Sequence, residues 1–248
     1  PAMDRIAEQG ARFELAYSAN PVCLPTRITM MTGRYPSRYG IGYNPDGATC
    51  AIPDADLESS MGWVFRNAGY ETVYAGKTHW PHNMTCESIG FHERLTGNDY
   101  GGLTEEAVRF INRDHDRPFL LVASYVNPHD ICFQAIDGFT EANGLPQRYT
   151  NLQTGRRFLS EALSMPPGVS REEFFESICP PLPDNHEVPQ GEPPEAGPRE
   201  DFQRWVRENW GEEDWRLHRW AYCRLTEQVD REIGRLLDAL RAAGLEEE

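Results

Sequence analysis

The hydrophobic pattern predicts alternating helices and strands in the first half of the chain. Residues 57–68 have helical spacing and end before Gly69, and residues 71–75 alternate and are rich in β-branched side chains, as in a strand. A second helix is expected from Thr104 to about residue 113. Residues 119–125 are almost continuously apolar, which favours a strand buried on both faces of a covered sheet. The order predicts an α/β fold.

The second half begins with a less regular segment. Residues 132–204 have little periodicity and many prolines, so we expect an insertion or loop region over the mouth of a pocket. A disordered linker is the alternative, although Phe174, Phe175 and nearby tryptophans favour packing. Residues 212–243 have the apolar stripe of one long helix.

Composition and charge exclude several classes of protein. The 248 residues carry a net charge of -15, which argues against a nucleic-acid partner. No apolar run is long enough to span a membrane. No signal peptide is visible, and this absence excludes nothing, because the chain begins within a helical pattern. The six cysteines are widely spaced, which excludes a zinc framework and favours free thiols, with one or two disulfides left open.

The stretch from Cys23 to Arg27, Cys-Leu-Pro-Thr-Arg, carries the first candidate chemistry. Pro25 suits the first turn of a helix, so Cys23 is expected at a loop-to-helix junction, where free amide groups favour negative charge. No acidic residue lies between Leu15 and Pro45, whereas three arginines do. This window therefore predicts a local anion site.

The chain contains one lysine, Lys77, beside 23 arginines. It lies in Gly-Lys-Thr-His, just after the strand predicted at 71–75, where functional residues gather in α/β sheets. A lysine kept in so arginine-rich a chain is expected where a compact ammonium is needed rather than a planar guanidinium. Chance retention of one surface lysine is the less favoured alternative. A metal site made by His79, His82 and Cys86 is a weaker reading, because Pro81 interrupts the spacing.

A third candidate follows the strand predicted at 119–125. The chain continues there as Asn127-Pro128-His129. Taken alone, His129 would be interpreted as a capping or packing histidine at a turn. Taken with the two motifs before it, in this order, His129 becomes a candidate functional residue.

Together these motifs resemble the type I, formylglycine-dependent sulfatases of the alkaline-phosphatase-like superfamily. The resemblance rests on Cys-x-Pro-Thr-Arg with a following Thr-Gly-Arg, on Gly-Lys-x-His, and on Pro-His, in the family's order. It implies a sandwich of helices around a mostly parallel central sheet. The chain departs from the family at Thr78, where tryptophan is usual, and has Trp80 instead.

The resemblance also implies a mechanism. A maturation enzyme oxidises Cys23 to formylglycine, whose hydrate is bound to Ca²⁺ or Mg²⁺ and attacks the sulfur of a small anionic sulfate ester, expected to be a sulfated carbohydrate. Arg27 steadies the hydrate and Lys77 binds sulfate. His79 takes the proton of the second hydroxyl, and His129 contacts sulfate and protonates the leaving oxygen.

The family places its other metal ligands before residue 1 and after residue 248. We therefore expect the chain to be the middle of one catalytic domain, inactive by itself and lacking strands of the sheet. The family favours a periplasmic or secreted location. Two alternatives remain open: a phosphonate or phosphate monoester hydrolase of the same superfamily, and a non-catalytic binding module with an unmodified Cys23.

Overall fold

A parallel sheet organises the first part of the chain. The structure, a computed structural model, describes residues 1–97, 100–194 and 197–246. Three strands, β1 (Glu71–Gly76), β2 (Glu93–Thr96) and β3 (Phe119–Ser124), pair in parallel in the order β2-β1-β3. β1 and β3 pair in register, so that Gly76 faces Ser124 and the strands end together. The predicted strands and their α/β arrangement are confirmed.

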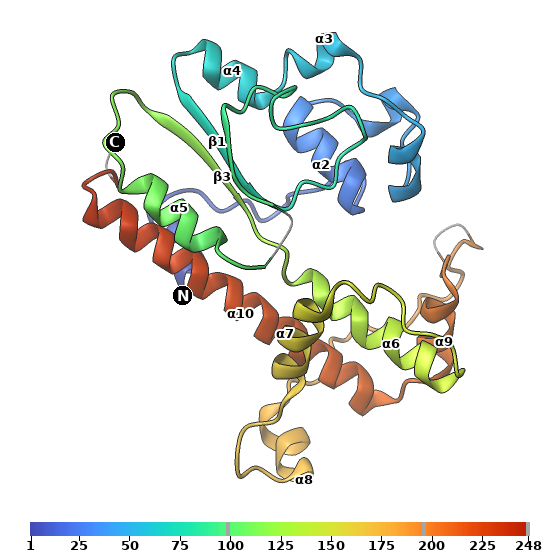
Figure 1. Ribbon diagram of the computed structural model, residues 1–248. Helices are drawn as coiled ribbons and strands as arrows, with labels where there is room; N and C mark the ends of the chain where they lie inside the picture. Colours follow the sequence, from blue (N-terminus) through green and yellow to red (C-terminus); the bar gives the residue numbers. More distant parts are fainter. Residues whose placement is uncertain (98–99, 195–196, 247–248) are drawn as a thin grey trace. The chain divides into compact units, whose positions relative to one another are not determined.

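The chain divides into two units, Pro1–Val126 with Asp230–Glu248, and Asn127–Val229. In the first unit, α5 lies on one side of the strands, and α2 and α4 lie on the other (Figure 1). Besides the end of α10, the helices and helical turns of this unit are α1 (Ala2–Gln9), α2 (Cys23–Thr32), η1 (Pro36–Tyr39), η2 (Asn44–Ala48), α3 (Asp54–Leu57), α4 (Met61–Asn67) and α5 (Leu103–Ile111).

Three local expectations need correction. The helix predicted over 57–68 is two helices, because the chain is extended at the fully buried Ser60, whose hydroxyl donates to the carbonyl of Ile89. α5 begins after Gly102, and Thr104 does not cap it but exchanges a hydrogen bond with the hydroxyl of Tyr125. β3 is half-buried rather than buried, because it is an edge strand of the described sheet.

The core of the first unit joins α2 to the sheet. Leu24, Ile28 and Met31 on the buried face of α2 pack in one cluster with Tyr74 of β1 and with Phe91. The ring of Tyr74 meets those of Phe91 and Trp80 edge to face. Since the side chains of a strand alternate between its faces, Tyr74 points toward α2 while its neighbours in β1 point away from it. This packing places the first turn of α2 beside the sheet.

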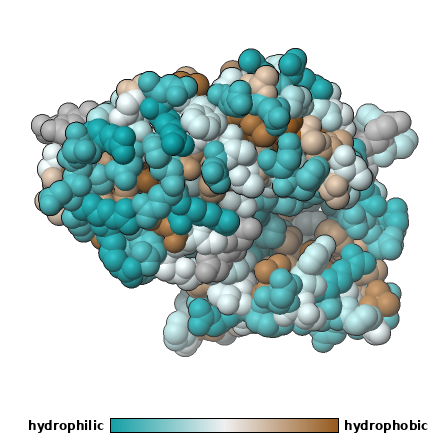
Figure 2. Space-filling view, turned by 45° about the horizontal axis from the view of Figure 1, so that its top comes forward, coloured by the Kyte–Doolittle hydropathy of each residue, from teal (hydrophilic) through white to brown (hydrophobic). Residues whose placement is uncertain are grey.

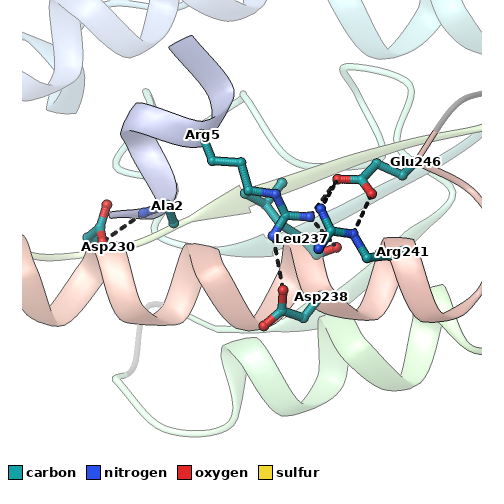
Figure 3. A network of polar contacts seen from close by, with 7 residues as sticks. All are labelled: Ala2, Arg5, Asp230, Leu237, Asp238, Arg241 and Glu246. Carbon is teal, nitrogen blue, oxygen red and sulfur yellow. Dashed lines mark hydrogen bonds and ion pairs between the residues drawn. The ribbon is translucent and has the colours of Figure 1, made fainter. Parts of the chain in front are cut away.

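The first helix of the chain is bound to the end of α10 (Glu212–Ala242) within the first unit (Figure 3). The amides of Ala2 and Met3 donate to the carboxylate of Asp230. Arg5 donates to Asp238 at 3.0 Å and to Glu246 at 2.5 Å. α1 has no fully buried residue, so these polar contacts, rather than a hydrophobic face, hold it in place.

This network is expected to weaken in acid. Hydrogen bonds from Arg241 and Arg5 lower the pKa of Glu246 from 4.5 to about 2, and the amides of Met3 and Ala2 lower that of Asp230. A carboxyl group whose pKa is lower in the folded state stabilises that state at pH values above the unfolded pKa. This stabilisation is lost as the pH falls through the folded pKa. Hydrogen-exchange protection of α1 should therefore decline between pH 4.5 and about 2. Glu246→Gln should reduce protection at pH 7 and flatten this decline; an unchanged profile would contradict the assignment.

The second unit is helical where a loop was expected. Helices occupy much of residues 132–178, so the expectation of an irregular region was wrong there, whereas residues 179–193 contain no helix. The helices and turns of this unit, besides the first part of α10, are η3 (His129–Ile131), α6 (Cys132–Ala142), α7 (Gln153–Leu163), α8 (Arg171–Glu173), η4 (Phe174–Ile178) and α9 (Asp201–Asn209). The packing of Phe174 and Phe175 against Trp220 confirms that the aromatic residues pack.

The surface, the cysteines and the helix lengths bear on three of the expectations from composition. Figure 2 shows hydrophilic residues over most of the face in view, with hydrophobic residues in small groups. All six cysteines are free thiols, so the one or two disulfides that the sequence left open are not formed. In the described part of the chain, no helix is both long and apolar enough to cross a membrane.

Candidate active site

Cys23 is the first residue of α2, at the predicted loop-to-helix junction. It is half-buried, and Pro25 follows it in the first turn. The free amides expected here are mostly occupied, since the amide of Leu24 donates to the side chain of Asn44 and that of Thr26 donates to the carbonyl of Val22. Pro25 has no N–H to offer. Attraction for an anion beside Cys23 therefore depends on side chains more than on the end of the helix.

Arg27 ties the first turn of α2 to the sheet. Residues i and i+4 lie on the same side of a helix, so Arg27 follows Cys23 along one face. Its Nη1 donates to the carbonyl of Lys77 and to the hydroxyl of Ser124, both at 2.9 Å. These acceptors lie at the carboxyl ends of β1 and β3. The arginine thus positions the helix that carries Cys23 at the sheet edge where α/β proteins place their sites.

The peptide groups of Lys77 are held on both sides. Its amide donates to the carbonyl of Ser124 at 2.8 Å. Its carbonyl accepts from Arg27 and, at 2.6 Å, from the hydroxyl of Tyr74. Tyr74 is fully buried, and burial raises the pKa of its phenol, so this hydroxyl remains a donor at neutral pH. The backbone from which the sole lysine side chain extends is therefore tightly positioned.

Tyr74 and Ser124 are positioning residues that we did not identify in the sequence. Ser124 is the polar residue that ends an otherwise apolar strand, and this ending was the available signal. Tyr74 gave no such signal, because a tyrosine in a buried strand is usually part of the core. Its hydroxyl reaches the Lys77 carbonyl only because the chain turns directly after Gly76.

The turn after β1 requires glycine. Gly76 has a φ of 91°, and a Cβ there would lie 2.2 Å from the carbonyl oxygen of Ser124. We expect Gly76→Ala to lower the free energy of unfolding by about 2–4 kcal/mol, through the left-handed backbone and the clash. Urea unfolding measures this effect. Gly101→Ala is the matched control, since nothing lies within 4 Å of its added Cβ, and it should change stability by less than about 0.5 kcal/mol. Equal effects would refute the steric argument.

His79 has an unusual backbone. Its φ is 50°, in the left-handed region that costs a non-glycine residue about 1–2 kcal/mol. The residue is half-buried, two positions after Lys77. Such conformations persist where the surrounding structure imposes them, and they are frequent at functional sites. The strain supports His79 as a functional residue rather than a surface histidine.

The described residues do not form a metal centre by themselves. Within this part of the chain, no group of three or more His, Cys, Asp or Glu side chains could hold a metal ion. This includes the alternative set His79, His82 and Cys86, of which His82 is exposed. The described residues therefore supply only an incomplete set of ligands for Ca²⁺ or Mg²⁺.

His129 belongs to the second unit, whereas Cys23, Arg27, Lys77 and His79 belong to the first. It begins the turn η3, and its Nδ1 lies 3.5 Å from a carboxylate oxygen of the fully buried Asp130. Its ring also meets that of Phe133 edge to face. The side chain of His129 is therefore partly exposed, and Asp130 and Phe133 of the same unit orient its ring.

Comparisons with known proteins agree with the motifs. A family model described as Sulfatase matches residues 1–248. A Delta 4,5-hexuronate-2-O-sulfatase of Bacteroides thetaiotaomicron is 25% identical over 198 residues, covering 75% of this chain and 35% of that protein. The N-acetylgalactosamine-6-sulfatase of Homo sapiens is 36% identical over 104 residues, covering 38% of this chain and 20% of that protein.

The fold agrees as well. The solved structure of a 2-O GAG sulfatase superposes with a TM-score of 0.66 at 23% identity, covering 98% of this chain and 50% of that chain. This likeness confirms the predicted arrangement of helices around a parallel sheet. The chain spans half or less of the length of each of these three relatives.

Proposed function

This chain belongs to the sulfatase family, and from that premise we propose that the protein hydrolyses a sulfate monoester of a carbohydrate. The observation that carries the proposal is the double hydrogen bond of Arg27, which joins the Cys23 helix to the backbone of Lys77 and to Ser124. A carbohydrate substrate is supported by the relatives, whose names refer to hexuronate and N-acetylgalactosamine.

Residue 23 is proposed as the nucleophile. Oxidation of the Cys23 thiol to formylglycine by a maturation enzyme would supply a hydrated aldehyde whose hydroxyl attacks sulfur, with Ca²⁺ or Mg²⁺ as the cation of the site. Its place at the first residue of α2, half-buried and joined through Arg27 to the strand ends, supports this role. Residue 23 would be one ligand of the cation.

Charge neutralisation falls to the side chains. A sulfate ester resists attack because its oxygens are negative, so preorganised positive groups lower the barrier. Lys77 is proposed to bind these oxygens, and Arg27 to balance negative charge on residue 23. The three hydrogen bonds of the Lys77 peptide supply the preorganisation that an isolated flexible lysine would lack.

Two histidines are proposed for proton transfer. His79 is proposed to take the proton that restores residue 23, and its position in a strained turn two residues after Lys77 supports this role. His129 is proposed to contact the sulfate and to protonate the departing alcohol oxygen. Positioned histidines contribute about 10²–10⁴-fold to such steps.

Mass spectrometry of the tryptic peptide spanning residues 13–27, from full-length protein made in its native host, tests the proposal. An aldehyde in place of the thiol, together with faster turnover of an aryl sulfate than of an aryl phosphonate, is the expected result. A faster phosphonate reaction would reassign the substrate class. An unmodified thiol in protein that hydrolyses neither ester would refute catalysis at residue 23.

A further inference from the structure

A large groove lies within the second unit and contains none of the residues assigned above to catalysis. Its volume is about 1340 Å³, which exceeds the roughly 300–1,000 Å³ of pockets for single small molecules. One wall is the proline-rich segment 181–188, and the other comes from the junction of α9 and α10. This size and construction suit an elongated ligand.

The wall formed by the junction of α9 and α10 is aromatic. The rings of Trp210 and Trp215 meet edge to face with their centroids 4.8 Å apart, and the ring of His218 lies 5.2 Å from that of Trp210. Both tryptophans line the groove and are half-buried. Burial lowers the pKa of His218 to about 4, and its Nδ1 lies 2.9 Å from the Gln134 amide oxygen. The three rings are therefore uncharged at neutral pH.

The opposite wall is held in place before any ligand arrives. Arg216 of α10 donates to the carbonyl of Cys179 at 2.8 Å and to that of Pro180 at 3.2 Å. Arg219 donates to the carbonyl of Pro181. Prolines restrict the backbone further, since their φ is fixed. A preformed wall of this kind reduces the ordering cost of binding.

The polar groups of the groove disfavour an anion. Its three carboxylates outnumber its two arginines, and they are Asp184, Glu187 and Glu212. Arg207 is already paired with Glu192 through hydrogen bonds of 2.7 and 3.2 Å. Arg219 is bonded to a backbone carbonyl. The carboxylates are acceptors, so they suit a ligand that presents hydroxyl donors.

We propose that this groove binds a hydroxyl-bearing saccharide unit that carries no sulfate ester. The C–H face of a pyranose ring packs against the electron-rich faces of Trp210 and Trp215, and its hydroxyls donate to Asp184 and Glu187. The proposal rests on the proposed sulfatase function for its choice of a glycan. An aromatic groove of similar shape also suits a proline-rich peptide, so the experiment includes one.

Isothermal titration of the full-length protein tests the proposal with unsulfated hexasaccharides of glucose, galactose and N-acetylglucosamine, their sulfated forms, and a proline-rich decapeptide. At least one unsulfated hexasaccharide should bind, and more tightly than its sulfated form. Trp210→Ala and Trp215→Ala should each weaken binding about 10-fold or more. Glu187→Ala changes an exposed residue, so the variant protein should fold normally. It should weaken saccharide binding about 3- to 10-fold.

Trp205→Ala is the control, since Trp205 lies in the same unit and packs near Phe139 outside the groove. The proposal would be overturned if saccharide binding were unchanged in both tryptophan variants. It would also be overturned if the protein bound only sulfated sugars, only the peptide, or none of these ligands. Turnover of a simple aryl sulfate, which has no saccharide, should be unaffected by the groove variants. That turnover reports on the proposed function alone, so the two ideas fail separately.

Discussion

Cys23→Ala is expected to lower kcat for an aryl sulfate by at least about 10⁴-fold, because it removes the thiol that is needed for conversion of the Cβ into the proposed aldehyde. The substitution deletes one sulfur at the half-buried start of α2, whose fold depends on Leu24, Ile28 and Met31 rather than on the thiol. The melting temperature should therefore change little while activity disappears.

Cys223→Ala is the matched control for this loss. Cys223 is also a free thiol, but it is exposed on α10 and has no part in the proposed chemistry. Its activity should stay within about twofold of the unsubstituted protein. Retention of activity by Cys23→Ala would show that another group attacks sulfur and would return the binding-module reading of Cys23 to consideration.

The elements around the site could be predicted from local sequence. β1 shows alternation and β-branched residues, β3 is an apolar run, and Pro25 marks the start of α2. Each of these signals acts over a few residues, because the propensity of a strand or a helix start is set by its own side chains. The parallel arrangement of the strands was expected only from the resemblance to the sulfatases, and the observed pairing confirms it.

Two helices of the second unit, α7 and α9, were not predicted, although the part of α10 in the same unit was. α9 buries only Val206, and α7 buries Gly155, Leu159 and Ala162. Both helices are amphipathic, but they bury few residues and lie beside prolines, which suggested a loop. Their stability comes from packing against residues such as Leu225 of α10, far away in the sequence.

The contacts that position the site were also beyond local pattern. The two acceptors of Arg27 lie 50 and 97 residues away in the chain. The motif suggested that Arg27 reaches toward Cys23, but nothing local indicates a carbonyl at the end of one strand and a hydroxyl at the end of another. Such contacts follow from the register of β1 with β3, which only the folded sheet defines.

Those contacts lead to the second large effect. Arg27→Ala is expected to lower kcat/KM by about 10²–10³-fold, comparable with the loss of one preorganised donor at a developing anion. The free energy of unfolding should fall by only about 1–2 kcal/mol, because the carbonyl of Lys77 keeps its hydrogen bond from Tyr74. Arg27→Lys should recover little activity, since an ammonium on a flexible stem does not reproduce the rigid planar guanidinium, whose Nη1 donates to both acceptors.

Ser124→Ala separates the two contacts. It removes one acceptor of Arg27 and leaves its charge and its bond to Lys77 in place, so kcat/KM should fall less than about 10-fold. Peptide mass must accompany each rate, because only protein converted at residue 23 is comparable. The peptide ends at residue 27 in Arg27→Lys and at Arg34 in Arg27→Ala. If converted Arg27→Ala protein were as active as the unsubstituted protein, Arg27 would be a structural tie between α2 and the sheet, and the charge on residue 23 would need another partner.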